Sequence, residues 1–195
     1  MLKNVIKLLA ITLLSATMLQ AVGYNVDKDA TKIKWHAEKV TGEHDGYVSI
    51  KSGSLDVENG MIEDGEFVID MKSITNTDIE DEGYRSKLEN HLKSEDFFSV
   101  EKYPEAKFVI TSVKKKGDKQ LVTGKLTIKG ITHEVTIPVK VTVSQDVVTA
   151  MGNLTIDRSK YNVQFRSKSF FDIEALGDKM IYDEFTINLH LVAKK

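Results

Sequence analysis

The stretch GKLTIKGITHEVTIPVKVTV, residues 124–143, decides the fold class of this chain. Apolar and polar residues alternate before and after Lys129-Gly130, a dipeptide typical of a turn. Successive side chains of a strand point to opposite faces, so this alternation predicts strands with one buried and one wet face. Two such runs joined by a short turn predict an antiparallel hairpin.

The same two-residue period recurs along the chain from Tyr24 onward. Turn dipeptides are predicted between the runs at Asn59-Gly60, Asp64-Gly65 and Gly117-Asp118. One wet face per strand is typical of antiparallel sheets. We therefore expect an all-β protein, and the alternation leaves open whether the strands close as a barrel or stack as a sandwich. The residues expected on the buried faces are Ile33, Trp35, Ala37, Phe67, Ile69, Met71, Phe108, Ile110, Leu126, Ile128, Val135, Ile137, Val139, Val141, Val143, Gly152, Leu154, Ile156, Phe185, Ile187, Leu189 and Leu191.

One segment departs from the strand pattern and predicts a short helix from about Gly83 to Lys93. Tyr84, Leu88 and Leu92 recur at every fourth position, which places them on one face of a helix. Acidic residues precede the segment and Lys93 ends it, the order that the helix dipole favours.

The N-terminal 23 residues have the layout of a secretory signal peptide, with lysines, an apolar run over residues 8–19 and small residues near a cleavage site at 21–23. The run is short for a membrane span, and an uncleaved anchor is the alternative. We expect a single mature domain, residues 24–195, in the periplasm, without stable membrane insertion. No cysteine is present, so its core alone must hold it together.

The charge balance argues against nucleic acid as a partner. The chain has 27 basic and 29 acidic residues, a formal charge of -2, and loss of Lys3 and Lys7 with the leader gives -4. Nucleic acids and anionic membrane surfaces both require a concentrated basic face as a main binding surface.

Motifs for catalysis or metal binding are few. Asp78, Glu80, Glu82, Gly83 and Glu89 have the spacing of a calcium-binding EF-hand loop, but a predicted strand precedes them where that loop requires a helix. The five histidines, His36, His44, His91, His133 and His190, lack the short repeated spacings of a zinc site. No nucleophile-elbow, dinucleotide-binding or phosphate-binding loop occurs, so the sequence predicts no enzyme, metal or cofactor.

Large apolar residues outside the strand pattern raise the question of what the sheet encloses. Phe97-Phe98 and Phe170-Phe171 are such pairs, and Trp35 is the only tryptophan. Aromatic residues commonly fill a core, and an eight-stranded barrel is just wide enough either to be filled by side chains or to hold one small ligand.

Two linked stretches of the chain are HLKSEDFFSVEKYPEAKF (residues 91–108) and VTGKLTIKGITHEVTIPV (residues 122–139), and SGSLDVENG, IDRSKYNV and DEFTINLHLVA accompany them. In these segments the chain resembles the YceI-like family, often described as polyisoprenoid-binding proteins with a lipocalin-like barrel. The resemblance implies an extended antiparallel barrel of about eight strands, a helix near one mouth, and a hydrophobic lumen for an isoprenoid or similar lipid. The resemblance also implies that a homodimer can form.

On this resemblance we expect an exported, non-catalytic lipid-binding protein, with a charged head group, where one is present, at the mouth near Arg85, Lys87, Arg158 or Arg166. The alternative is a structural or stress-related interaction module with a filled core and no ligand. The candidate lumen residues are Trp35, Phe67, Ile69, Phe97, Phe98, Phe108, Ile110, Leu126, Val135, Ile137, Leu154, Phe170, Phe171, Phe185, Ile187 and Leu189.

Overall fold

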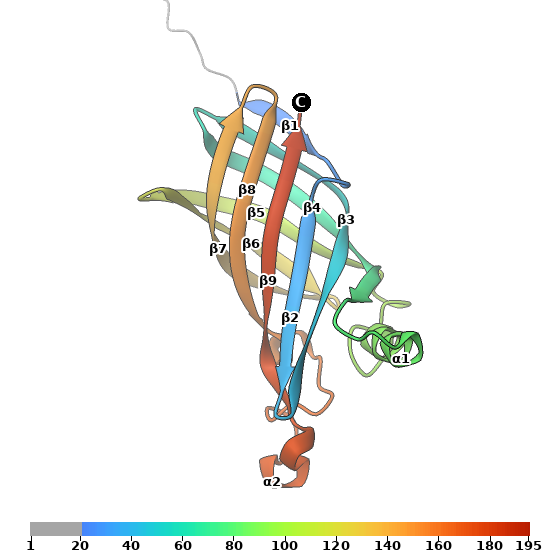
Figure 1. The fold of residues 1–195 in the computed structure, drawn as a ribbon. Helices are drawn as coiled ribbons and strands as arrows, with labels where there is room; N and C mark the ends of the chain where they lie inside the picture. Colours follow the sequence, from blue (N-terminus) through green and yellow to red (C-terminus); the bar gives the residue numbers. More distant parts are fainter. Residues whose placement is uncertain (1–20) are drawn as a thin grey trace, which may run out of the picture.

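A computed structural model of the chain describes residues 21–195, and most of the predicted signal peptide, residues 1–20, lies outside the described residues. Strands dominate the described chain (Figure 1). The strands are β1 (Val22–Val26), β2 (Lys32–Lys39), β3 (Gly42–Glu58), β4 (Met61–Asn76), β5 (Glu105–Lys116), β6 (Lys119–Ile128), β7 (Ile131–Ser144), β8 (Val147–Asp157) and β9 (Ile181–Lys194). The helices are α1 (Glu82–Lys93) and the short α2 (Ile173–Leu176), with 3-10 turns η1 (Arg158–Tyr161) and η2 (Gly177–Lys179).

Strands β2 to β9 form a closed antiparallel barrel of eight strands. Their order is β3-β2-β9-β8-β7-β6-β5-β4, and pairing of β4 with β3 closes the ring. The short β1 pairs with β3 and β9 beyond the end of β2, so β1 and β2 occupy the same position in the barrel in succession. The barrel is thus the arrangement adopted, and the sandwich is not.

The hairpin predicted at residues 124–143 is present as β6 and β7. Ile128 pairs with Ile131, and Lys129 and Gly130 between them have φ angles of 52° and 76°. Positive φ at both central residues is the requirement of a type I′ turn, whose twist matches that of the flanking strands. The Lys-Gly dipeptide therefore sets the register of this hairpin.

The turn predicted at Asp64-Gly65 is wrong, because both residues lie inside β4. Gly65 pairs with Leu55 of β3, next to a register shift between Asp56 and Val57. A Cβ on Gly65 would lie 3.0 Å from the Ser54 carbonyl oxygen, so glycine here permits close approach of two strands. The turns predicted at Asn59-Gly60 and Gly117-Asp118 connect β3 to β4 and β5 to β6.

Helix α1 confirms the predicted short helix. The Asp81 side chain accepts a hydrogen bond from the Tyr84 amide, and His91 and Lys93 lie in the last turn, so both ends suit the helix dipole. The helix packs near β4 and has no fully buried residue. The turns and α2 between residues 158 and 179 gather at one end of the barrel (Figure 1).

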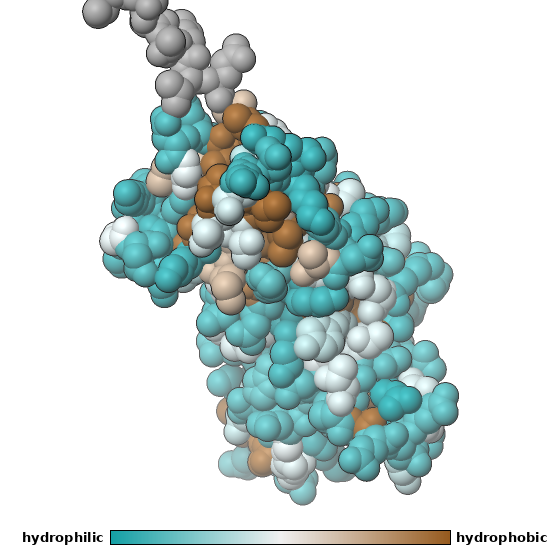
Figure 2. Space-filling model, turned by 45° about the horizontal axis from the view of Figure 1, so that its top comes forward, coloured by the Kyte–Doolittle hydropathy of each residue, from teal (hydrophilic) through white to brown (hydrophobic). Residues whose placement is uncertain are grey.

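Figure 2 tilts the end that carries β1 and the C-terminus towards the reader. The face it shows is mostly hydrophilic, with apolar side chains gathered near that end. None of the helices among residues 21–195 has the length and apolar character to cross a bilayer.

Candidate functional site

The barrel encloses an apolar cavity of about 240 Å³. This is many times the roughly 10–15 Å³ that admits one water molecule, so the inner side chains do not fill the barrel. Its wall comes from the inner faces of β2 to β9, and Leu92 of α1 with the following Phe97 and Phe98 completes it. The other wall residues are Ile33, Trp35, Ala37, Val48, Ile50, Leu55, Ile62, Phe67, Ile69, Met71, Ile74, Ala106, Phe108, Val122, Leu126, Ile128, Ile137, Val139, Ala150, Leu154, Ile156, Arg158, Ile181, Tyr182, Phe185, Ile187, Leu189 and Leu191.

The aromatic side chains of the wall are held in place by specific contacts. The indole nitrogen of Trp35 donates a hydrogen bond to the Thr75 carbonyl oxygen at 3.1 Å, which satisfies its one polar group. Phe67 and Phe108 stack on adjacent strands with ring centroids 6.4 Å apart. Gly124 makes room for Phe108, since a Cβ there would lie 2.5 Å from the ring. These rings form a fixed wall with an unfilled space beside them.

Most of the predicted lumen residues lie in the cavity wall. They are Trp35, Phe67, Ile69, Phe97, Phe98, Phe108, Leu126, Ile137, Leu154, Phe185, Ile187 and Leu189. Ile110 is buried in the core and Val135 packs against it, and neither belongs to the wall. Phe170 and Phe171 are 42% and 50% exposed and lie outside the wall, in the loop before α2.

Half of the wall residues that the sequence did not single out come from β3 and β4. Val48, Ile50 and Leu55 of β3 do not keep one uninterrupted two-residue period, because the pairing of β3 with β4 contains several register shifts. A bulge moves the following side chains to the other face. The apolar residues of β3 can be recognised in the sequence. The face of the sheet to which each of them points cannot, because it depends on the bulges.

Arg158 is the only charged residue in the cavity wall formed by the described chain. It is 4% exposed and donates hydrogen bonds to the carbonyl oxygens of Tyr182, Val163 and Ile181 at 2.8–3.0 Å. Its Nη2 lies 3.5 Å from Oδ1 of Asp183, which is also buried. Burial lowers the pKa of Arg158 from its ordinary value, and the nearby Asp183 and Asp157 oppose that effect.

The other basic residues considered for a head group lie elsewhere. Arg85 donates to the carbonyl oxygens of Ile79 and Glu80, and Lys87 lies over the ring of Tyr84. Arg166 lies over the ring of Phe165 and is exposed. Only Arg158 of the four reaches the cavity wall.

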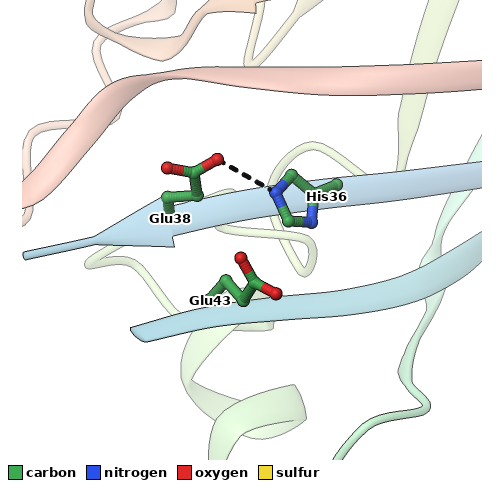
Figure 3. A group of neighbouring side chains, drawn as sticks. All are labelled: His36, Glu38 and Glu43. Carbon is green, nitrogen blue, oxygen red and sulfur yellow. Dashed lines mark hydrogen bonds and ion pairs between the residues drawn. The ribbon is translucent and has the colours of Figure 1, made fainter. Parts of the chain in front are cut away.

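His36, Glu38 and Glu43 form a group on the outer face of β2 and β3, with one potential metal-ligand atom from each within 4.8 Å of the others (Figure 3). His36 contacts Glu38 through Nε2 at 3.2 Å and Asp45 through Nδ1 at 3.3 Å. The hydrogen bond with Glu38, aided by Asp45, outweighs burial and raises the pKa of His36 above 6.5. A proton therefore competes with any metal for Nε2. The group lies on the opposite side of the strand from the cavity-lining Trp35 and Ala37.

The residues with EF-hand spacing make contacts within the protein. Asp78 accepts hydrogen bonds from the Asp45 amide and the Asn76 side chain and contacts His44. Glu89 accepts from the Asn76 amide. Strand β4, not a helix, precedes the segment, so an EF-hand is not formed.

Comparison with known proteins agrees with this architecture. The model of the YceI-like domain matches residues 24–193. A UPF0312 protein of Pseudomonas putida is 35% identical over 147 residues, which cover 70% of this chain and 71% of that protein. The Photorhabdus laumondii UPF0312 protein plu2095 is 55% identical over 50 residues, which cover 26% of each chain.

Solved structures show the same fold. BcnA of Burkholderia cenocepacia superimposes with a TM-score of 0.67 at 28% identity, covering 86% of this chain and 98% of that one. A structure described as a polyisoprenoid binding domain from Saccharophagus degradans gives a TM-score of 0.63 at 14% identity, covering 88% and 97%. With its eight-stranded barrel and a family match over nearly all of the described residues, this chain belongs to the YceI-like family.

Proposed function

We propose that this protein is an exported, non-catalytic carrier that holds a long apolar ligand, an isoprenoid or similar lipid, inside its barrel. The observation that carries the proposal is the cavity of about 240 Å³, whose wall contains a single charged side chain. The solved barrel described as polyisoprenoid-binding supports the choice of ligand class through its fold.

Solvent exclusion is sufficient to hold such a ligand. Transfer of apolar surface from water stabilises by roughly 25 cal/mol per Å², or about 0.8 kcal/mol per methylene group. A chain with many methylene or methyl groups therefore binds without a network of polar contacts. The wall offers such a chain mainly aliphatic and aromatic contacts.

The proposal includes the periplasm as the compartment, on the evidence of the predicted signal peptide, and formation of a homodimer. Binding rather than catalysis is favoured because the cavity wall lacks a nucleophile paired with a base. The alternative, a structural or stress-related module with a filled core, predicts no cavity of useful size, and the open cavity favours the carrier over it.

Titration of the purified protein with a long-chain polyprenol tests the proposal. Trp35 is the only tryptophan and lies in the cavity wall, so ligand entry is expected to change its fluorescence in a saturable way. The unfolding midpoint is expected to rise with ligand concentration, because the ligand binds the folded state. A flat titration together with an unchanged midpoint would contradict the proposal.

A pair of adjacent substitutions provides the control. Ala150 lies in the cavity wall, whereas its neighbour Met151 is 56% exposed on the outer face of β8. Ala150→Phe is expected to weaken polyprenol binding at least about tenfold by occupying the space, and Met151→Phe to leave binding unchanged. Equal effects of the two changes would place the ligand outside the barrel.

A further inference from the structure

One end of the cavity is polar. Arg158 and Ile181 lie where β8 ends and β9 begins, whereas Ile62 and Val122 line the cavity towards the β3–β4 hairpin. Apart from Arg158, the wall residues carry no formal charge. An amphiphilic lipid in the cavity therefore contacts one polar region, at Arg158. Its orientation depends on whether its head group binds at that end.

At this end, the hydrogen-bonding groups of Arg158 and Asp183 are only partly satisfied by other protein groups. A guanidinium group has five N–H donors. In Arg158 three of them bond to backbone carbonyl oxygens. Of the two that remain, the one on Nη2 belongs to the nitrogen that lies 3.5 Å from Asp183 Oδ1 in an ion pair, and the other is on Nη1. Asp183 Oδ2 accepts from the Ser169 hydroxyl, but its Oδ1 has no hydrogen-bond donor among the described residues, although Asp183 is only 6% exposed.

The charge of this end is already balanced. Asp183 pairs with Arg158, and Asp157 is close enough to act electrostatically on the same guanidinium. The one buried cation therefore already has a carboxylate partner, 3.5 Å away. A phosphate or carboxylate added here would gain no unpaired positive charge and would lose its hydration, which makes its burial unfavourable.

From this arrangement we infer that the cavity selects lipids with a small uncharged head group, such as a hydroxyl, bound beside Arg158 with the chain extending towards Ile62. This rests on the proposed lipid-binding function and specifies its ligand class. An uncharged hydroxyl can accept from the remaining Arg158 donor without bringing a second negative charge to the Arg158–Asp183 pair.

The test compares a polyprenol with the monophosphate of the same polyprenol, both titrated into the full chain and followed by Trp35 fluorescence. The wild type is expected to bind the alcohol at least about tenfold more tightly than the phosphate. Asp183→Asn keeps the side-chain shape but removes the counter-charge of Arg158. It is expected to strengthen phosphate binding about tenfold and to change alcohol binding by less than about threefold.

Glu184→Gln is the matched control, since it removes one negative charge at the next residue of β9, on an exposed position. It is expected to leave the ratio of the two affinities unchanged. Tighter binding of the phosphate by the wild type, or equal ratios in Asp183→Asn and wild type, would overturn the inference while leaving lipid binding intact. Binding of neither lipid would overturn the proposed function together with the inference. The ratio of alcohol to phosphate affinity in the wild type tests the head-group selectivity even if Asp183→Asn fails to fold.

Discussion

At the scale of single residues, the barrel depends on glycines where strands and large side chains come close. Gly46 of β3 lies opposite Trp35. A Cβ on Gly46 would overlap the Thr75 carbonyl oxygen and lie 2.5 Å from the indole ring. Because one obstacle is backbone and the other a side chain hydrogen-bonded to that same carbonyl, neither can move easily.

Gly46→Ala is therefore expected to lower the free energy of unfolding by about 2 kcal/mol or more, the upper part of the usual range for overpacking. Denaturant unfolding followed by circular dichroism measures the change. Gly83→Ala, at the start of α1, is the control and is expected to be neutral or slightly stabilising, since alanine favours helix over glycine. Equal effects at the two sites would refute this account of Gly46.

Arg158 has a structural role apart from any ligand. Arg158→Met would leave three carbonyl oxygens, one buried and two part-buried, and the buried Asp183 carboxylate without their partner. The expected loss is about 3–5 kcal/mol of unfolding free energy, as for breaking a buried ion pair from one side. Arg166→Met, on an exposed position, is expected to change stability by less than about 0.5 kcal/mol. A loss below about 1 kcal/mol for Arg158→Met would contradict this role.

Apolar residues that line the cavity could be predicted from the sequence, whereas the buried Arg158–Asp183 pair could not. Trp35, Phe108 and Ile137 could be predicted because each belongs to an uninterrupted alternating run. The pairing of Arg158 with Asp183 joins residues 25 positions apart, and nothing local to either residue indicates it. Phe170 and Phe171 are exposed in the segment between η1 and α2, two short helical elements that the sequence did not predict.

At the scale of elements, α1 depends on its caps more than on burial. None of its residues is fully buried, while Asp81 caps the first turn through the Tyr84 amide at 2.9 Å. Asp81→Ala is expected to cost about 1 kcal/mol of helix stability, and Asp81→Asn much less, because asparagine caps as well as aspartate. Amide hydrogen exchange in residues 82–93 provides the measurement. Unchanged exchange rates in Asp81→Ala would show that the cap is dispensable.

The ribbon of β2 and β3 has a pH-dependent contribution from His36. The folded pKa of His36 is raised above its unfolded value, chiefly by Glu38. Its stabilising effect is therefore fully present below about pH 6.5 and is lost as the pH rises through the folded pKa. The stability difference between wild type and His36→Gln is expected to fall by a few tenths of a kcal/mol between about pH 5.5 and pH 8.5. Unfolding midpoints across this range check it, and a constant difference would contradict it.

Element prediction succeeded where the pattern was local. The β6–β7 hairpin and α1 each depend on a period and a terminal signal within about 20 residues. The failure at Asp64-Gly65 shows the limit, since Gly65 serves close packing between β3 and β4 rather than a turn. Whether a strand glycine marks a turn or a close contact depends on a partner strand that the local sequence does not name.

At the scale of the whole molecule, the central feature is a closed sheet around space that side chains do not fill. Closure requires β4 to pair with β3 on one side and β5 on the other, and alternation alone is equally compatible with a sandwich. The family resemblance correctly anticipated the barrel. The cavity depends on how the side chains of eight strands meet, which no single stretch of sequence determines.

The most direct test of the carrier account is lipid extraction and mass spectrometry on protein purified from its native compartment, with quantitation against protein. The account predicts about one long-chain lipid per barrel, with an uncharged head group, and much less of it in Ala150→Phe than in Met151→Phe. Repeated recovery of barrels without lipid would contradict the account.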